Sequence, residues 1–314
     1  MGRRRIVILN DSSVARGGAT ALALMAARHL AARGHEVVFL CGDSGDDGAL
    51  AAAGVEVVAL GSPRLRDNPR AMLTGIRNTA ARGLVERFIR ERDTPDTVYH
   101  VHGWSQILSP ELFSALAPVA RRTLIHAHDM FLACPNGVSM DYRRQEVCTR
   151  VPLSGSCIAT NCDKRSYLHK LWRVARQRAL WRRLDLSLGW GGILTIHPAM
   201  IPRLARAGYP EAMMTALRNP VQPFSTSRIA AEENRGVVCV GRLEPDKGVG
   251  ELAAAAARTG VALTLVGDGP MRAELEARYP EVRITGWAGR DEIGPLVAGA
   301  RALVMPSRHP EPFA

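Results

Sequence analysis

Lysine and aromatic residues are both scarce in this sequence. Only three of its 41 basic residues are lysines. Aromatic residues make up 5% of the chain, so we expect a core of Val, Leu, Ile and Ala.

No apolar run reaches the ~18 residues that would span a bilayer. The apolar stretch behind the basic start covers only residues 6–9, which is too short for a signal peptide. The sequence therefore predicts a cytoplasmic protein.

Positive charge is concentrated in the first two thirds of the chain. Residues 1–218 hold 30 basic and 18 acidic residues, whereas residues 219–314 hold 11 and 12. A basic field of this kind favours an anionic partner, such as a membrane surface or a phosphorylated acceptor. Solubility and an arginine-rich mutational bias explain the same excess without any partner, and both interpretations stay open. We expect no nucleic-acid partner.

Apolar runs typical of buried strands alternate with helical segments, which predicts parallel sheets covered on both faces. The expected strands are residues 5–10, 35–40, 55–60, 98–101, 123–127, 193–196, 237–240, 262–266, 282–285 and 302–305. The expected helices include residues 20–33, 69–92, 164–185, 198–206, 271–278 and 291–298.

A segment with two prolines and an asparagine, residues 218–223, interrupts this alternation and is the predicted hinge. The sequence thus predicts an α/β fold of two Rossmann-like, doubly wound domains, residues 1–218 and 219–314. The second would have four strands, fewer than open sheets of this kind usually carry, so we expect it to be incomplete.

Ligands of doubly wound sheets bind beyond the carboxyl ends of the strands. Gly17 and Gly18 follow the first expected strand and precede a helix, where backbone amides can approach a phosphate. A plain strand–helix turn explains the same pair. The spacing G-x-G-x-x-G is absent, which argues against a dinucleotide.

The second half carries a more specific pattern at its strand ends. Arg242 and Lys247 follow one strand, and two cations there can neutralise a diphosphate as it leaves a sugar. Lys247 is the only lysine of residues 219–314, and a cation at a helix start is disfavoured unless an anion is near. Gly267 and Gly269 end the next strand, and the last strand is followed by the carboxylate of Glu311.

The order V-G-R-L-x-x-x-K-G, V-G-D-G-P and M-P-S-x-x-P-E-P-F resembles family 4 of the retaining glycosyltransferases, which have the GT-B fold. The resemblance is strong over residues 237–314 and moderate over 1–128. It implies that Arg242 and Lys247 hold the diphosphate of a UDP- or GDP-sugar donor, that Glu311 hydrogen-bonds the donor sugar, and that no cofactor is required.

The resemblance extends to the first domain. It implies that the loop of Gly17 and Gly18 faces the diphosphate and that a histidine after a strand contacts the reacting sugar, best matched by His128 in the run L-I-H-A-H-D. In the family, a second glutamate eight positions after the one matching Glu311 holds the ribose. That position, 319, lies past the end of the printed sequence, so we expect a truncated enzyme with little or no transferase activity.

Cysteines and histidines form two further groups. In a reducing cytoplasm, four clustered cysteines favour structural zinc over disulfides, although their spacing is not a tight C-x2-C pair, and unlinked thiols are the alternative. Two H-x-H pairs, residues 100–102 and 126–128, end neighbouring strands; no further ligand pattern accompanies them, so a metal site there is disfavoured. The zinc candidates are Cys134, Cys148, Cys157 and Cys162.

The expected helix 164–185 is strongly basic and carries Trp172, features typical of helices that lie on anionic membranes. A helix packed on the core with one solvated face is the alternative. The resemblance implies a glycosyltransferase that moves a sugar from a nucleotide-sugar to a sugar or lipid-linked acceptor with retention, in cell-surface polysaccharide or glycoconjugate synthesis. We expect it to be cytoplasmic or peripheral on the inner face of the plasma membrane. The alternatives are a GT-B sugar-nucleotide epimerase and a non-catalytic remnant.

Overall fold

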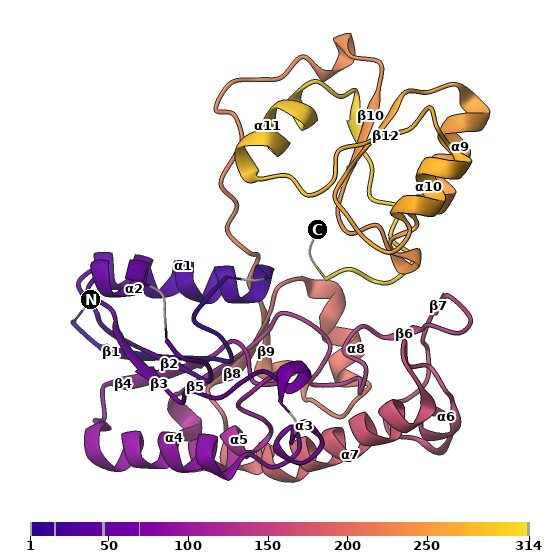
Figure 1. The fold of residues 1–314 in the computed structure, drawn as a ribbon. Coiled ribbons are helices and arrows are strands. Elements are labelled where there is room, and N and C mark those ends of the chain that lie inside the picture. Colours follow the sequence, from indigo (N-terminus) through magenta and orange to yellow (C-terminus); the bar gives the residue numbers. More distant parts are fainter. Residues whose placement is uncertain (1, 16, 46–47, 69, 313–314) are drawn as a thin grey trace. The chain divides into compact units, whose positions relative to one another are not determined.

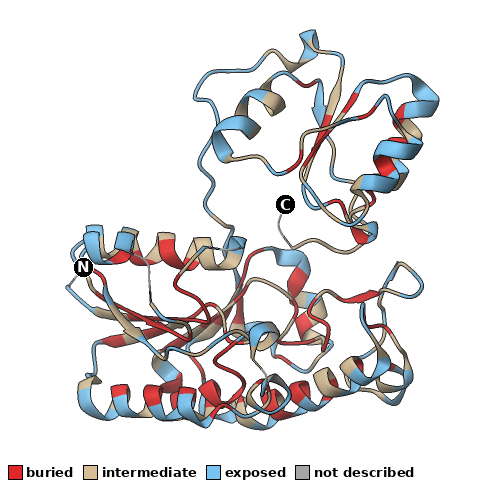
Figure 2. Ribbon diagram, in the orientation of Figure 1, coloured by how far each residue is buried: buried red, intermediate tan, exposed pale blue. Residues whose placement is uncertain are grey.

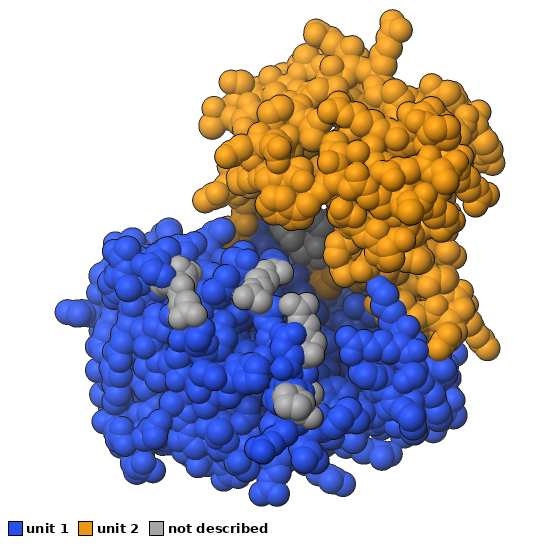
Figure 3. Space-filling view, viewed as in Figure 1, with its two compact units in different colours: residues 1–138, 149–219, 313 blue, residues 139–148, 220–312, 314 orange. Residues whose placement is uncertain are grey.

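The computed structural model describes residues 2–15, 17–45, 48–68 and 70–312. The described chain divides into two compact units, as Figure 3 shows. The first comprises residues 2–138 and 149–219, and the second comprises residues 139–148 and 220–312.

The first unit is built on a parallel sheet of seven strands in the order β3-β2-β1-β4-β5-β8-β9. In register, Ile8 of β1 lies opposite Phe39 of β2 on one side and His100 of β4 on the other. The strands are rich in Val, Ile and Leu and are mostly buried, as expected for a parallel sheet covered on both faces (Figure 2). The strands are β1 (Arg5–Asn10), β2 (Glu36–Cys41), β3 (Glu56–Ala59), β4 (Thr97–Val101), β5 (Thr123–Ala127), β8 (Gly192–Thr195) and β9 (Met214–Ala216).

Helices cover both faces of this sheet because successive strand residues point to opposite sides. Val7 and Leu9 belong to one core cluster, shared with α4, α5 and α7, whereas Ile8 belongs to another, shared with α1 and α2 on the opposite face (Figure 1). The helices are α1 (Gly18–Ala32), α2 (Gly48–Ala52), α3 (Ala71–Thr74), α4 (Thr79–Arg92), α5 (Glu111–Leu116), α6 (Gly155–Ala159), α7 (Tyr167–Arg183) and α8 (Ile201–Ala205).

The predicted helix 69–92 is two helices, α3 and α4. Asn78 interrupts it: its side chain accepts a hydrogen bond from the amide of Ala81 at 3.1 Å, which caps α4, and donates to the carbonyl of Ile107 at 2.8 Å. Helix α7 begins at Tyr167, later than predicted, because the hydroxyl of Ser166 accepts from the amide of His169 and caps it there.

The second unit carries a smaller parallel sheet in the order β12-β11-β10-β13, together with an antiparallel hairpin of β6 (Met140–Asp141) and β7 (Glu146–Val147). One core cluster joins its sheet to α9 and α10, and another joins it to α11. The remaining elements are β10 (Val237–Val240), β11 (Leu263–Val266), β12 (Arg283–Ile284), β13 (Ala302–Leu303), α9 (Val249–Thr259), α10 (Arg272–Arg278) and α11 (Arg290–Ala298). Within the described residues, we find no helix that is both long enough and apolar enough to cross a membrane.

Candidate functional site

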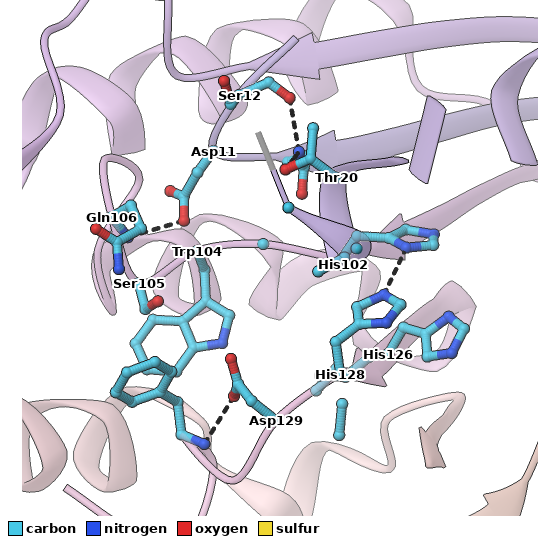
Figure 4. Close-up of a pocket in the computed structure, with 18 of the residues that line it drawn as sticks. Asp11, Ser12, Thr20, His102, Trp104, Ser105, Gln106, His126, His128 and Asp129 are labelled. Atoms are coloured by element: carbon cyan, nitrogen blue, oxygen red, sulfur yellow. Dashed lines mark hydrogen bonds between the residues drawn. The ribbon is translucent and has the colours of Figure 1, made fainter. Parts of the chain in front are cut away.

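A pocket of about 340 Å³ opens at the carboxyl ends of β1, β4 and β5 in the first unit. Figure 4 shows its polar side chains converging from the segments that follow β1 and β4 and from the end of β5. Two of the predicted site features, the glycine pair at the start of α1 and His128, both line it. The lining residues include Asn10, Asp11, Ser12, Gly17, Gly18, Thr20, His102, Trp104, Gln106, His126, His128 and Asp129.

Gly17 and Gly18 are not required by the chain's own packing. A Cβ built on either residue would meet nothing within 4 Å, and the φ of Gly17, −178°, is open to any residue. Gly17 precedes the first turn of α1, where backbone N–H groups lack partners in the helix itself. The glycines therefore leave open space at a helix start that favours an anion.

Four histidines, at 100, 102, 126 and 128, form one cluster beside this pocket. His102 is 6% exposed; its Nδ1 lies 2.9 Å from Nε2 of His128, and its Nε2 lies 3.3 Å from Nδ1 of His100. Burial lowers the pKa of each imidazole, to about 3 for His100 and His128 and about 4 for His126. All four are therefore neutral near pH 7.

Asp11 fixes one wall of the pocket. Its carboxylate accepts hydrogen bonds of 2.8 Å from the amides of Gln106, Ile107 and Leu108, which ties the loop after β4 to the end of β1. Burial raises the pKa of Asp11, although these hydrogen bonds oppose the shift. Sequence reasoning missed this role, because the amides lie 95 to 97 residues away.

Asp129, which is half-buried, and Arg176, which is buried, are a second pair of polar residues that sequence reasoning missed. Burial raises the pKa of Asp129 to about 6 and lowers that of Arg176 to about 10. The guanidinium of Arg176 lies 4.7 Å from the centre of the Phe131 ring and donates to the carbonyl of Ser105 at 3.0 Å. Arg176 belongs to the basic helix predicted over residues 164–185, and its burial shows that not every cation of that helix faces solvent.

In the second unit, Lys247 and Glu311 meet beyond the ends of β10 and β13. The ammonium of Lys247 pairs with the carboxylate of Glu311, which also accepts from the hydroxyl of Ser307 at 2.6 Å. Burial raises the pKa of Glu311, but these hydrogen bonds outweigh it and hold the pKa below its ordinary value. Arg242 is mostly exposed and pairs with Glu244 at 2.8 Å.

The glycines of the second unit have a structural explanation. A Cβ on Gly267, whose φ is +148°, would lie 1.9 Å from the carbonyl oxygen of Gly241. A Cβ on Gly269 would lie 2.4 Å from the carbonyl oxygen of Leu243. Backbone packing between the loops after β10 and β11 therefore requires both glycines, whatever ligand binds nearby.

The predicted zinc ligands Cys157 and Cys162 are buried beside Lys170, which is fully buried itself. The Nζ of Lys170 lies 3.1 Å from the sulfur of Cys162 and 3.6 Å from that of Cys157. Among the described residues, no three cysteine sulfurs lie within 4.8 Å of one another. Cys148 follows β7, in the hairpin that groups with the second unit.

Two family models match consecutive parts of the chain. The model described as Glycosyltransferase Family 4 matches residues 16–223, and the model described as Glycosyl transferases group 1 matches residues 234–314. The first match alone covers more than half of the sequence. The protein is thus a glycosyltransferase, and the chain belongs to glycosyltransferase family 4. A comparison with curated proteins gives no match.

Solved structures support the fold. The Anabaena protein HepE in complex with UDP is 19% identical, with a TM-score of 0.57 over 99% of this chain and 76% of that one. The lipopolysaccharide outer core galactosyltransferase WaaB is 14% identical, with a TM-score of 0.60 over 96% and 74%. A glycosyltransferase from Rickettsia africae is 12% identical, with a TM-score of 0.58 over 98% and 74%. At these identities the likeness establishes the fold alone, and it confirms the predicted GT-B class.

Proposed function

We propose that the chain transfers a sugar from a UDP- or GDP-sugar to a sugar or lipid-linked acceptor, with retention of configuration, in the synthesis of a cell-surface polysaccharide or glycoconjugate. The observation that carries the proposal is the pairing of Lys247 with Glu311 at the strand ends of the second unit. A cation suited to a diphosphate thereby stands beside a carboxylate suited to sugar hydroxyls. Family membership and the UDP bound by HepE support a nucleotide-sugar donor.

Donor binding would rearrange this pair. The diphosphate competes with Glu311 for the ammonium of Lys247, which frees the carboxylate to accept hydrogen bonds from the donor sugar. Arg242 is exposed enough to turn from Glu244 toward the same phosphates. Both cations then stabilise the nucleoside diphosphate as its bond to the sugar breaks. The departing diphosphate helps to deprotonate the acceptor hydroxyl.

The pocket of the first unit supplies the remaining groups. Gly17 and Gly18 offer backbone amides to an anion at the start of α1, and His128 contacts the reacting sugar. The imidazole of His128 is neutral near pH 7, so it can donate or accept one hydrogen bond without placing a charge beside the sugar.

Product analysis tests the proposal. The chain is incubated with UDP- and GDP-sugars, with and without sugar acceptors, and the products are followed by NMR. Acceptor-dependent release of nucleotide with the donor's anomeric configuration supports it. Inversion of configuration refutes retention. Formation of an epimerised nucleotide-sugar, or of an epimerised free sugar and nucleoside diphosphate through hydrolysis, without acceptor identifies the epimerase instead. If neither UDP nor GDP raises the melting temperature, the chain is a non-catalytic protein.

An exposed face of α7 and α3 supports a peripheral membrane position. Leu168 and Leu73 are 77% and 74% exposed, and the indole of Trp172 donates to the carbonyl of Met72, which joins the two helices. Arg178 and Arg182 extend the exposed stripe of α7. Apolar side chains flanked by cations suit an anionic bilayer. Cosedimentation with phosphatidylglycerol vesicles but not phosphatidylcholine vesicles is expected, and equal binding by a Leu168→Asp variant would remove this assignment.

The cysteines remain candidates for a structural zinc ion. Thiolates that bind zinc would balance the buried ammonium of Lys170 and accept its N–H groups, and the present contacts of Cys157 and Cys162 are compatible with that. Binding of all four would require the cysteine sulfurs to draw closer together. One zinc per chain, lost in a Cys157→Ser, Cys162→Ser variant, is the expected result.

A further inference from the structure

The histidine cluster has the geometry of ligands around one ion. One ligand nitrogen from each of His100, His102 and His126 lies within 4.8 Å of the other two. Two nitrogens bound to one tetrahedral zinc, with Zn–N bonds of ~2.0–2.1 Å, lie about 3.3 Å apart. The observed separation of 3.3 Å between Nε2 of His102 and Nδ1 of His100 matches that value.

Hydrogen bonding within the cluster does not account for His126. Both of its ring nitrogens are buried, and within the described structure neither has a hydrogen-bond partner. Buried polar atoms normally have partners, so an imidazole with none points to a group that the protein itself does not provide.

The outer contacts of the cluster also fit. A histidine that binds a metal through one nitrogen usually donates its other N–H to a fixed acceptor. If Nε2 of His102 binds the ion, its Nδ1–H can donate to Nε2 of His128 at 2.9 Å, and this contact holds the ring in place. His102 and His128 are stacked, with ring centres 5.1 Å apart.

We propose that His100, His102 and His126 bind a divalent transition-metal ion, with zinc as the preferred ion. Three neutral imidazoles suit Zn²⁺, Co²⁺ or Ni²⁺ and disfavour Mg²⁺ and Ca²⁺, which prefer oxygen ligands. His102 and His126 line the pocket of the first unit, so a fourth ligand would come from that side, where water or a hydroxyl or carboxylate oxygen of a bound molecule can enter. The site is independent of the proposed donor chemistry of the second unit.

The sequence alone argued against this site, because it shows two separate H-x-H pairs and no further metal-ligand pattern beside either pair. The sheet supplies the missing neighbour: β4 and β5 are adjacent and parallel, with His100 in register with Leu124. Both H-x-H pairs therefore come to the same edge of the sheet, and within each pair alternation puts the side chains on one face.

Cobalt binding tests the proposal without relying on activity. The probe is Co²⁺ added to metal-free chain that carries Cys157→Ser and Cys162→Ser, so that the cysteines cannot supply the site. We expect one Co²⁺ per chain, with the visible absorption of a four-coordinate ion and no thiolate charge-transfer band. His126→Gln and His100→Gln should each raise the Kd at least tenfold, whereas His169→Gln, on α7 and bonded to Arg165, should not change it.

Absence of bound Co²⁺ in the cysteine variant, or an unchanged Kd in His126→Gln, would overturn the site. Should the histidine variants fail to fold, X-ray absorption of the zinc-loaded natural chain decides: imidazole scatterers support the site, and sulfur scatterers alone refute it. Nucleotide-induced stabilisation, measured with a chelator present, reports on the donor site separately, so failure of one proposal does not imply failure of the other.

Discussion

Asp11 should be among the most sensitive positions of the first unit. Asp11→Ala removes an acceptor that three amides share, and its side chain is only 7% exposed. A buried amide without a partner costs ~1–3 kcal/mol, and water can reach part of the pocket wall, so we expect a loss of about 3–5 kcal/mol. For a unit of this size that corresponds to a melting temperature lower by about 6–20 °C.

The chain provides a convenient assay for this loss. Four of its five tryptophans, at 104, 172, 181 and 190, lie in the first unit, so tryptophan fluorescence during urea unfolding follows that unit. Asp11→Asn should lose less, about 1–2 kcal/mol, because one oxygen still accepts from Ile107 and Leu108 while its amide faces the N–H of Gln106. Asp96→Ala, an exposed position, is the control. A loss below 1 kcal/mol in Asp11→Ala would show that the loop holds without the carboxylate.

Further predictions concern both units. Burial raises the pKa of Asp129 to about 6, with Arg176 and Asp11 facing it. As pH rises from about 4 to 6, the carboxyl ionises in the unfolded chain before it does in the folded one, so the unfolding free energy should fall by up to about 3 kcal/mol. Asp129→Asn should flatten that part of the stability profile measured by urea unfolding, and an unchanged slope contradicts the assignment. Arg242→Ala and Lys247→Ala should each raise the barrier to donor turnover by about 2–4 kcal/mol, and rates near the natural chain's would exclude them. His128→Ala should lower kcat while leaving the melting temperature within a few degrees, and unchanged kinetics would remove it from the site.

The strands were predictable because their signal is local. Runs such as residues 6–9 and 237–240 are continuously apolar, and parallel strands buried on both faces need that composition. The sheet order was not predictable: β1 lies between β2 and β4, and nothing in the apolar runs specifies which neighbours pair. The break between α3 and α4 depends on Asn78, whose second partner, Ile107, is 29 residues away.

The buried charges of α7 were missed for a related reason. Helical periodicity identifies an apolar stripe but does not reveal whether a cation beside that stripe has a partner. Lys170 is buried because the sulfurs of Cys157 and Cys162 accept its N–H groups, and Arg176 because aromatic rings and the carbonyl of Ser105 surround it. These partners come from other segments, and only the assembled fold brings them to the helix.

Glycine shows how one sequence signal can have two causes. At Gly267 and Gly269 the backbone of a neighbouring loop occupies the space of a side chain, so the protein would need glycine there even without a substrate. At Gly17 and Gly18 no atom of the described chain lies within 4 Å of a built Cβ, so packing within the first unit gives no reason for glycine. The motif V-G-D-G-P is therefore the more recognisable pattern but the weaker argument for ligand contact. The glycine pair at the start of α1 is common in sequences, yet its surroundings favour a bound anion because the space it leaves open belongs to the pocket.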